Sequence, residues 1–263
     1  MTAPLRLLTI GFSHYCEKAR WALDHAGLDY VEEDHVPMLH WAANRRVGAE
    51  KRTVPVLVAP RGVLGESSEI VRFADEALPP ARRLFPEEPA ARAEVEAWVE
   101  LFDRSLGPAT RRGMYSLLLH DTRRSRELLA STGAAWERRV VRLLFPVFRA
   151  LMVQGMKVKP GPSARSIARV DEIFAQVGER LADGRRYLAA GRFTAADLTF
   201  AALAGAALVP PQYGFVFPPV EQLPAEAAAW VVRLRATPAG QFALRLYAEE
   251  RPRVRAQGRS DLG

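Results

Sequence analysis

Short apolar runs alternate with segments of helical periodicity along the first 78 residues of the chain. Leucine and β-branched residues form strand-like runs at 5–10, 30–36, 54–59 and 63–64. Apolar side chains recur at helical spacing between and after these runs, at 16–26, 39–49 and 67–77. Gly27 is expected to end the first of these helices, because glycine favours the position just after a helix. The pattern predicts the element order β-α-β-α-β-β-α.

Everything that follows this first unit is helical in pattern. A parallel βαβ unit followed by a hairpin and a closing helix is the arrangement of the thioredoxin fold. The fold class is therefore α/β plus all-α: a thioredoxin-like domain at 1–78, a proline-rich linker at 79–88, an all-helical domain at 89–250 and a mobile tail at 251–263. Helices of the second domain are expected at 89–120, 123–155, 163–183, 195–208, 224–236 and 239–250.

The composition narrows the class of protein. A length of 263 residues fits two domains. Cys16 is the only cysteine, which excludes an internal disulfide and a cysteine-based zinc site and favours a reducing compartment. The first residues lack the pattern of a signal peptide, so a cytoplasmic location is expected. The uncharged run at 198–220 contains four prolines, which predicts a buried helix followed by a loop and no membrane span.

The net charge of +7 is due to arginine, because only four of the 37 basic residues are lysine. The arginines are spread along the chain and interleaved with glutamates, a pattern that argues against nucleic-acid binding. Ten of them lie between Arg104 and Arg149 and indicate either a solvated surface or an anionic ligand or partner.

The first candidate site is the polar turn that follows the first strand, where the first helix begins. A helix N-terminus stabilises an anion such as a thiolate, so the Ser13 hydroxyl is either a hydrogen-bond donor to a bound thiolate or a plain helix cap. Cys16 would have a lowered thiol pKa there if it were accessible, but its spacing with Ala19 and Leu23 favours an inert, packed side chain. His14 and Tyr15 could line a pocket or be exposed.

Two further segments carry candidate binding groups. A cis peptide before Pro55 would leave the Val54 backbone free to pair with an extended peptide, although proline at a strand start is also a common structural device. Glu66 can accept from an α-ammonium group and Ser67 can donate to an α-carboxylate, although this pair alone is an ordinary helix cap.

A fourth segment carries a folding signal. Thr194 and Asp197 are spaced as a capping box, and Phe193 with Leu198 forms a hydrophobic staple. This pattern predicts that the uncharged helix after it begins abruptly inside a core.

Taken in this order, the four segments resemble the glutathione transferase superfamily from about residue 5 to 250. The turn looks like a glutaredoxin-type Cys-Pro-Tyr-Cys motif in which Ser13 replaces the first cysteine and His14 the proline. The resemblance implies that Ser13 activates the glutathione thiol, as in the serine-type classes. Cysteine-type classes have cysteine at that position and perform thiol transfer.

The resemblance also implies a glutathione site. Val54 ahead of cis-Pro55 would bind the cysteinyl part, and Glu66 with Ser67 would hold the γ-glutamyl end. The usual Asn-Pro-x-Gly approach to the cis-proline is replaced here by Gly-Ala-Glu-Lys-Arg-Thr at 48–53. Phe12, His14 and Tyr15 would complete the site, and the candidates for the glycyl carboxylate are Lys51, Arg52, His40 and Trp41.

In this superfamily the second substrate lies between the domains. The helical domain is longer than usual, with its excess at 106–162, where Pro108 and Pro146 are expected to bend or break two helices. Arginines in this region would favour an anionic or carbonyl-bearing cosubstrate, or they are surface residues. The expected pocket residues are Arg104, Arg111, Met114, Tyr115 and Leu118.

The function implied is a glutathione-dependent transferase that presents the glutathione thiolate to a small-molecule electrophile, a detoxification chemistry with glutathione as cosubstrate and no metal. A homodimer is expected, with no nucleic-acid or membrane partner. Two alternatives remain: a thiol-disulfide oxidoreductase that uses Cys16, and a non-catalytic binding protein with the same fold.

Overall fold

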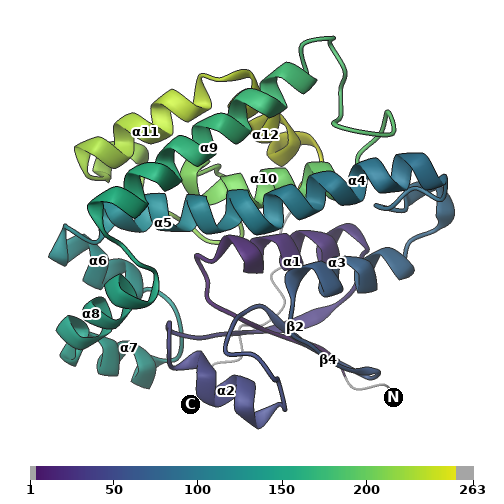
Figure 1. Cartoon of the computed structure of the whole chain (residues 1–263). Helices are drawn as coiled ribbons and strands as arrows, with labels where there is room; N and C mark the ends of the chain where they lie inside the picture. The colour runs from purple at the N-terminus through teal and green to yellow at the C-terminus, as the bar shows by residue number, and fades with distance from the viewer. Residues whose placement is uncertain (1–3, 253–263) are drawn as a thin grey trace.

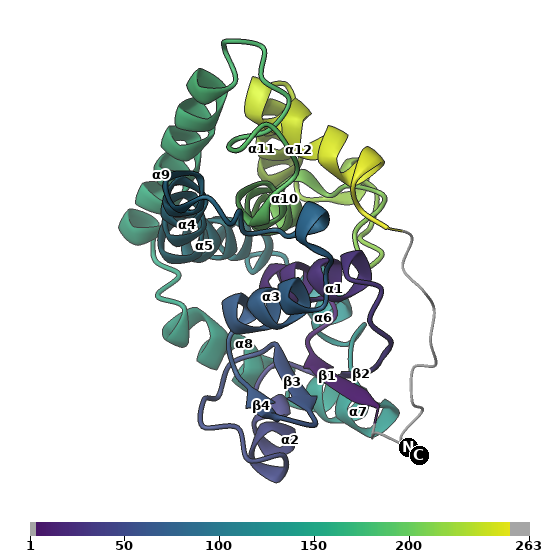
Figure 2. The ribbon, with the colours of Figure 1, turned by 90° about the vertical axis from the view of Figure 1, so that its right-hand side faces the viewer.

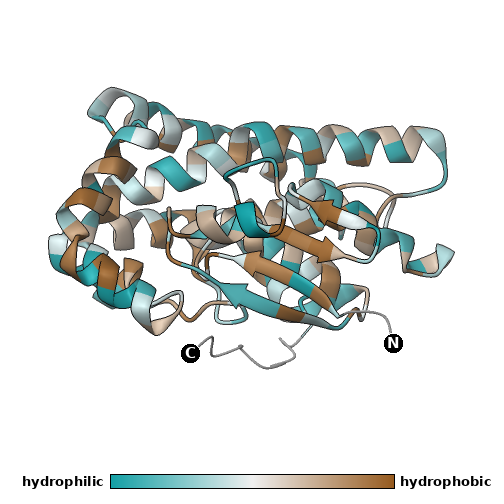
Figure 3. Ribbon diagram, turned by 90° about the horizontal axis from the view of Figure 1, so that it is seen from below, coloured by the Kyte–Doolittle hydropathy of each residue, from teal (hydrophilic) through white to brown (hydrophobic). Residues whose placement is uncertain are grey.

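A four-stranded mixed sheet forms the centre of the N-terminal domain in the computed structural model, which describes residues 4–252. Its strand order is β2-β1-β3-β4; β1 runs parallel to β2 and antiparallel to β3, which pairs antiparallel with β4. Leucine and valine side chains of the inner strands are buried, whereas the edge strand β2 is largely hydrophilic (Figure 3). The strands are β1 (Leu5–Thr9), β2 (Tyr30–Asp34), β3 (Val56–Ala59) and β4 (Gly62–Leu64).

Three helices cover the two faces of this sheet (Figures 1 and 2). The helices α1 (His14–His25) and α3 (Ser67–Glu76) lie between the sheet and the helical domain, and α2 (His40–Arg46) lies on the opposite side. The predicted thioredoxin-like element order is therefore confirmed. The helix α2 is shorter than its predicted range of 39–49, and α1 ends just before Gly27, which has a positive φ of 69°.

The second domain is helical. Two short 3-10 turns, η1 (Pro80–Arg82) and η3 (Val220–Gln222), lie in the linker and before α11. The main helices are α4 (Pro89–Leu101), α5 (Gly107–Leu118), α6 (Thr122–Leu129), α7 (Ala135–Leu143), α8 (Phe145–Gly155), α9 (Pro160–Arg180), α10 (Ala195–Leu208), α11 (Ala225–Arg235) and α12 (Pro238–Glu249).

Two of the predicted helices are divided in the structure. The range 89–120 contains the π-helical turn η2 (Phe102–Leu106) between α4 and α5, directly before Pro108, whose ring cannot donate an α-helical hydrogen bond. The range 123–155 is three helices, because Gly133 adopts a positive φ of 82° between α6 and α7, and Pro146 begins α8. The interruptions expected at Pro108 and Pro146 are present, whereas the break at Gly133 was not predicted.

The helix α10 lies at the centre of the helical domain, with thirteen of its fourteen residues buried. Its capping box is confirmed, since the Asp197 carboxylate accepts from the Thr194 amide and hydroxyl at 2.8 Å each and from the Leu188 amide at 2.8 Å. Burial raises the pKa of Asp197 to about 6, although these hydrogen bonds lower it in part. Among residues 4–252, no helix combines the length and apolar character that a membrane crossing requires.

The end of the described chain is tied to α1. Arg251 is buried and its guanidinium pairs with Glu17 at 2.9 Å and with Asp24 at 2.7 Å. The expectation of a mobile tail from residue 251 is therefore wrong for Arg251, because these two carboxylates hold it against α1. Residues 253–263 of that predicted tail lie outside the described residues.

Replacing Asp197 by alanine leaves three buried donor groups without their acceptor. We expect Asp197→Ala to lower the free energy of unfolding by roughly 2 kcal/mol or more, because each unpaired buried donor costs about 1–3 kcal/mol. Chemical denaturation monitored by circular dichroism measures this loss. The matched control is Asp183→Ala, whose carboxylate is exposed and pairs with Arg185 on the surface; an equal loss in both variants would contradict the role of the capping box.

Candidate functional site

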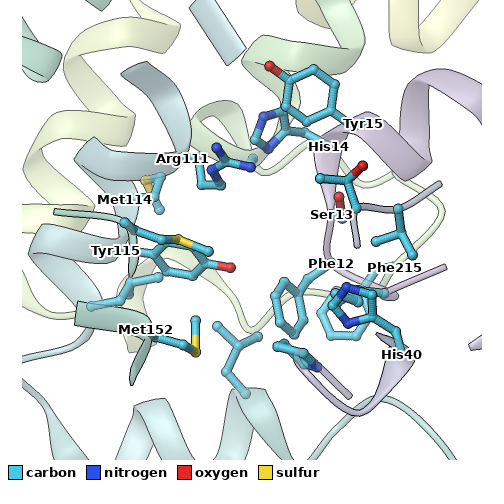
Figure 4. A pocket seen from close by; sticks show the side chains of 18 of the residues that line it. Phe12, Ser13, His14, Tyr15, His40, Arg111, Met114, Tyr115, Met152 and Phe215 are labelled. Carbon is cyan, nitrogen blue, oxygen red and sulfur yellow. The ribbon is translucent and has the colours of Figure 1, made fainter. Parts of the chain in front are cut away.

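A cavity of about 1530 Å³ lies between the two domains, and Figure 4 shows part of its lining. Its walls come from the turn before α1, the loop before β3, the start of α3, the helices α5, α6 and α8, and the loop after α10. Every candidate site residue predicted from the sequence except Cys16 lines this cavity: Phe12, Ser13, His14, Tyr15, His40, Trp41, Lys51, Arg52, Val54, Pro55, Glu66, Ser67, Arg104, Arg111, Met114, Tyr115 and Leu118.

Ser13 stands at the N-cap position of α1, and its side chain makes no capping hydrogen bond. The structure therefore does not support the interpretation of Ser13 as a plain helix cap. The hydroxyl is close enough to Cys16, one turn along the helix, to lower the pKa of the thiol, and it also lines the cavity. Because no helix amide engages this side chain, its O–H can donate to a ligand in the cavity.

Cys16 lies behind this turn, fully buried, and does not line the cavity. Burial raises the pKa of its thiol to about 11, although Arg20, the Ile10 backbone and the Ser13 hydroxyl lower it in part. A thiol that is neutral and inaccessible is a poor nucleophile. These two observations weigh against the alternative of a thiol-disulfide oxidoreductase that uses Cys16.

His14 is 4% exposed, and its Nε2 atom has no hydrogen-bond partner within residues 4–252. Burial and the nearby Arg111 guanidinium lower the pKa of His14 to about 3, while a hydrogen bond to the Gly107 backbone raises it. The imidazole is therefore neutral at physiological pH. It cannot act as an effective general base, because a base of this pKa has too little affinity for a thiol proton.

Tyr15 connects the turn to the helical domain. Its hydroxyl donates to the backbone carbonyl of Asp103 in η2 at 2.9 Å. The ring fits against Gly107, where a Cβ atom would come within 2.3 Å of the tyrosine hydroxyl. Burial raises the pKa of Tyr15, so its hydroxyl stays protonated and keeps this hydrogen bond.

Lys18 is a residue of the site region that the sequence reasoning missed. Its ammonium group is fully buried and donates to both Asp103 oxygens, at 2.7 and 2.8 Å, and to the Ser68 hydroxyl at 3.0 Å. Burial lowers the pKa of Lys18, while the Asp103 carboxylate raises it. This cluster joins α1, α3 and η2 directly beneath the cavity.

The peptide bond between Val54 and Pro55 is cis. The Val54 amide and carbonyl make no hydrogen bond within residues 4–252, so both are available to an extended ligand. The loop before them lacks the Asn-Pro-x-Gly sequence and is held instead by side chains of α2. His40 Nε2 lies 2.8 Å from the Arg52 carbonyl, and Asn44 donates to the Thr53 carbonyl at 2.8 Å.

Glu66 and Ser67 stand where α3 begins, facing the cavity. The Glu66 carboxylate pairs with Lys51, an ion pair that the sequence reasoning did not predict. The amides of Gly65 and Glu66 donate to Glu69, at 3.1 and 3.0 Å. Ser67 is buried and is the first residue of α3. The free backbone amides at this helix N-terminus are a favourable position for a carboxylate.

The other half of the cavity has an apolar wall. Met114, Tyr115 and Leu118 of α5 form one wall, and Figure 4 shows the Tyr115 hydroxyl directed toward the open centre. Burial raises the pKa of Tyr115 to about 12. Several lining residues were missed, because their helices and loop are far from the recognised motifs in sequence: Leu128, Leu151, Met152, Met156, Phe215 and Phe217.

The helices α6–α8 are fastened to the N-terminal domain beside the active-site turn. The Thr132 hydroxyl accepts from the Gly11 amide at 3.0 Å and donates to Asp34. Glu137 of α7 accepts from the Val36 amide at 2.9 Å and lies 2.9 Å from His35 Nδ1. The excess length of the helical domain therefore closes one end of the cavity. Within residues 4–252, no cluster of three or more His, Cys, Asp or Glu side chains is arranged to bind a metal.

The burial of Cys16 leads to a direct chemical test. We expect the native protein to react with iodoacetamide at pH 8 at least ~100-fold more slowly than the unfolded chain, because a thiol of pKa about 11 is almost wholly protonated there. Mass spectrometry of labelled protein measures both rates. A native rate equal to that of the unfolded chain would revive the oxidoreductase alternative.

The N-terminal domain matches a known family. Residues 7–82 match the model of the glutathione S-transferase N-terminal domain. No match to this chain is found among curated proteins.

Solved structures with the same fold cover nearly the whole chain. A theta class glutathione S-transferase from Xanthomonas axonopodis pv. citri with glutathione bound is 21% identical, covers 93% of this chain and 98% of its own, and has a TM-score of 0.56. A glutathione S-transferase from Methylobacillus flagellatus KT with glutathione bound is 17% identical, with coverages of 91% and 98% and a TM-score of 0.53. The beta-etherase LigF from Sphingobium sp. strain SYK-6 is 19% identical, with coverages of 92% and 99% and a TM-score of 0.60.

Identities this low establish a shared fold and leave the activity open. The family match covers the thioredoxin-like domain, and the structural likeness extends over the helical domain. Residues 7–82 therefore match the glutathione S-transferase N-terminal domain family, and the chain shares the fold of these solved structures over nearly its whole length.

Proposed function

We propose that this protein is a glutathione-dependent transferase that activates the glutathione thiol for attack on a small-molecule electrophile. One observation carries the proposal: the uncapped Ser13 hydroxyl faces the same cavity as the unpaired Val54 backbone and the start of α3. These three elements offer a thiolate donor, a peptide-pairing edge and a carboxylate site to a single extended ligand. Two of the structures with this fold contain bound glutathione.

Glutathione would lie along the loop before β3. The Val54 amide and carbonyl would pair with the cysteinyl residue, as a strand edge pairs with a peptide. The amide end of α3 and the Ser67 hydroxyl would hold the α-carboxylate of the γ-glutamyl group, and Glu66 would accept from its ammonium group. Because Glu66 already pairs with Lys51, that ion pair would open or be shared on binding.

The opposite end of the tripeptide would meet cationic side chains. Arg52 lies over the Trp41 ring, 5.4 Å from its centroid, and has no carboxylate partner within residues 4–252. Its guanidinium is the group available to the glycyl carboxylate, because the Lys51 ammonium is held by Glu66 at the γ-glutamyl end. Arg52 would take the place of the contacts that the missing Asn-Pro-x-Gly segment makes in the family.

Thiol activation would depend on the start of α1. The helix N-terminus and the Ser13 O–H favour the thiolate over the thiol, so the pKa of bound glutathione falls and its proton passes to solvent. The thiolate sulfur then attacks the electrophile, and the leaving group departs with the bonding electron pair. His14 takes no part in this proton transfer, because its pKa of about 3 makes the imidazole too weak a base to take the thiol proton.

Glutathione binding and turnover can be separated with two variants. Wild-type protein is expected to bind glutathione in calorimetry, and Ser67→Ala to weaken binding by about 10-fold or more, because a hydrogen bond to a charged group is lost. Ser13→Ala should keep the affinity within about twofold but lower kcat/KM by roughly 100-fold, since its donor acts on developing thiolate charge.

The control variant is Ser131→Ala, which removes a serine from the other half of the cavity and should leave both quantities unchanged. The proposal fails if wild-type protein does not bind glutathione at several millimolar. It also fails if Ser13→Ala turns over as fast as wild type with the thiol pKa of bound glutathione unaltered.

The homodimer implied by the resemblance also remains a proposal, as does the cytoplasmic location. A dimer would show a mass in solution of twice the 29.2 kDa of one chain. Size-exclusion chromatography with light scattering measures that mass over a range of protein concentrations. A single-chain mass at every concentration would contradict the dimer without affecting the proposed chemistry.

A further inference from the structure

Arg111 stands apart from the other cations that line the second half of the cavity. It is exposed to the cavity, and no carboxylate pairs with it within residues 4–252. Its guanidinium lies over the Tyr15 ring, 6.0 Å from the centroid. The other arginines of this half each have an acidic partner: Arg104 with Glu100, Arg123 with Glu127, and Arg124 with Asp121.

The acidic groups of the cavity are already neutralised. Asp103 is held by Lys18, Glu66 by Lys51, and Glu127 by Arg123. The charge of Arg111 is therefore uncompensated by the protein. An uncompensated guanidinium that faces a ligand cavity favours a carboxylate, because its planar donors match both carboxylate oxygens.

A buried polar side chain, His14, lies beside Arg111. His14 is 4% exposed, lines the cavity, and leaves its Nε2 atom without a partner among the described residues. Figure 4 shows its imidazole beside the Arg111 guanidinium, and the two are close enough for Arg111 to lower the pKa of His14. The imidazole stays neutral, so it adds a polar contact at this point without adding a second positive charge.

The surroundings of this polar pair are apolar and roomy. Met114 and Tyr115 of α5 and Met152 of α8 lie on the wall below Arg111, with Phe12 and Phe215 across the cavity (Figure 4). The volume of about 1530 Å³ exceeds the ~300–1,000 Å³ of common small-molecule sites. The cavity therefore has room for a tripeptide and a bulky apolar molecule at the same time.

We propose that the second substrate is an apolar or aromatic electrophile that carries a carboxylate, and that Arg111, beside His14 and Tyr15, is the residue that selects for this charge. The proposal rests on the proposed transferase function for the reaction, but the binding of the carboxylate does not depend on turnover. Arg111 acts on specificity, since the sulfur of glutathione is activated at Ser13.

A matched pair of aryl chlorides tests this selection during turnover. The probes are para-chloro-meta-nitrobenzoate and its primary amide, which share the ring and the leaving group and differ in charge. In both, the thiolate sulfur forms a bond to the ring carbon, the carbon–chlorine bond breaks, chloride leaves with the electron pair, and the thiol proton is released to solvent. We expect wild-type protein to prefer the benzoate.

The variant Arg111→Met should lower kcat/KM for the benzoate by about 10- to 100-fold, as expected for the loss of a charge-assisted hydrogen bond. It should change the value for the amide by less than about twofold. Arg169→Met is the matched control: this arginine pairs with Glu172 on α9 and does not line the cavity, so both probes should react as with wild type. Arg111→Lys, which keeps the charge, should restore part of the preference.

Binding without turnover separates this proposal from the proposed function. Calorimetry with naphthoate and naphthamide, with and without glutathione, should show the same Arg111-dependent preference for the anion. If glutathione fails to bind but naphthoate binds through Arg111, the transferase function fails and the carboxylate subsite stands. If Arg111→Met weakens the binding of the anion and of the amide equally, or changes the binding of neither, the proposed subsite is overturned whether or not glutathione binds.

Discussion

A buried ion pair between Lys18 and Asp103 fixes the position of the active-site turn relative to the helical domain. Lys18 is completely buried, so its charge is costly unless the carboxylate and the Ser68 hydroxyl remain in place. The same π-helical turn that supplies Asp103 receives the Tyr15 hydroxyl and ends at Gly107, against which the Tyr15 ring fits. The N-terminus of α1 is thereby held over α5, and the two halves of the cavity face each other.

A second buried charge cluster supports α1 from behind. Glu17 accepts from Arg251 and from the Gly214 amide, which belongs to the loop that carries Phe215. The same helix therefore positions the turn with Ser13 at its start and the apolar loop with Phe215 at its side. Such pairs contribute little net stability but tolerate few arrangements, because a displaced partner leaves a buried charge behind. Their effect is to define one geometry of the cavity.

Local patterns in the sequence were sufficient for the element order, the capping box at Thr194 and the residues of the N-terminal domain that were expected to line a cavity. They were insufficient where the cause is distant. Asp103 lies 85 residues from Lys18, and no sequence pattern near either residue predicts that the two form an ion pair. The buried state of Arg251 depends on its distant partners Glu17 and Asp24 in α1. The accessibility of Cys16 likewise depends on tertiary packing, which spacing alone indicates only as a tendency.

The central claim is that Ser13, and not Cys16, faces the sulfur of a bound tripeptide. A crystal structure of the protein with glutathione tests it most directly. We expect the glutathione sulfur within hydrogen-bonding distance of Ser13 Oγ, with the cysteinyl backbone paired to Val54 and Cys16 still buried behind the turn. A sulfur placed away from Ser13, or joined to Cys16 in a mixed disulfide, would contradict it.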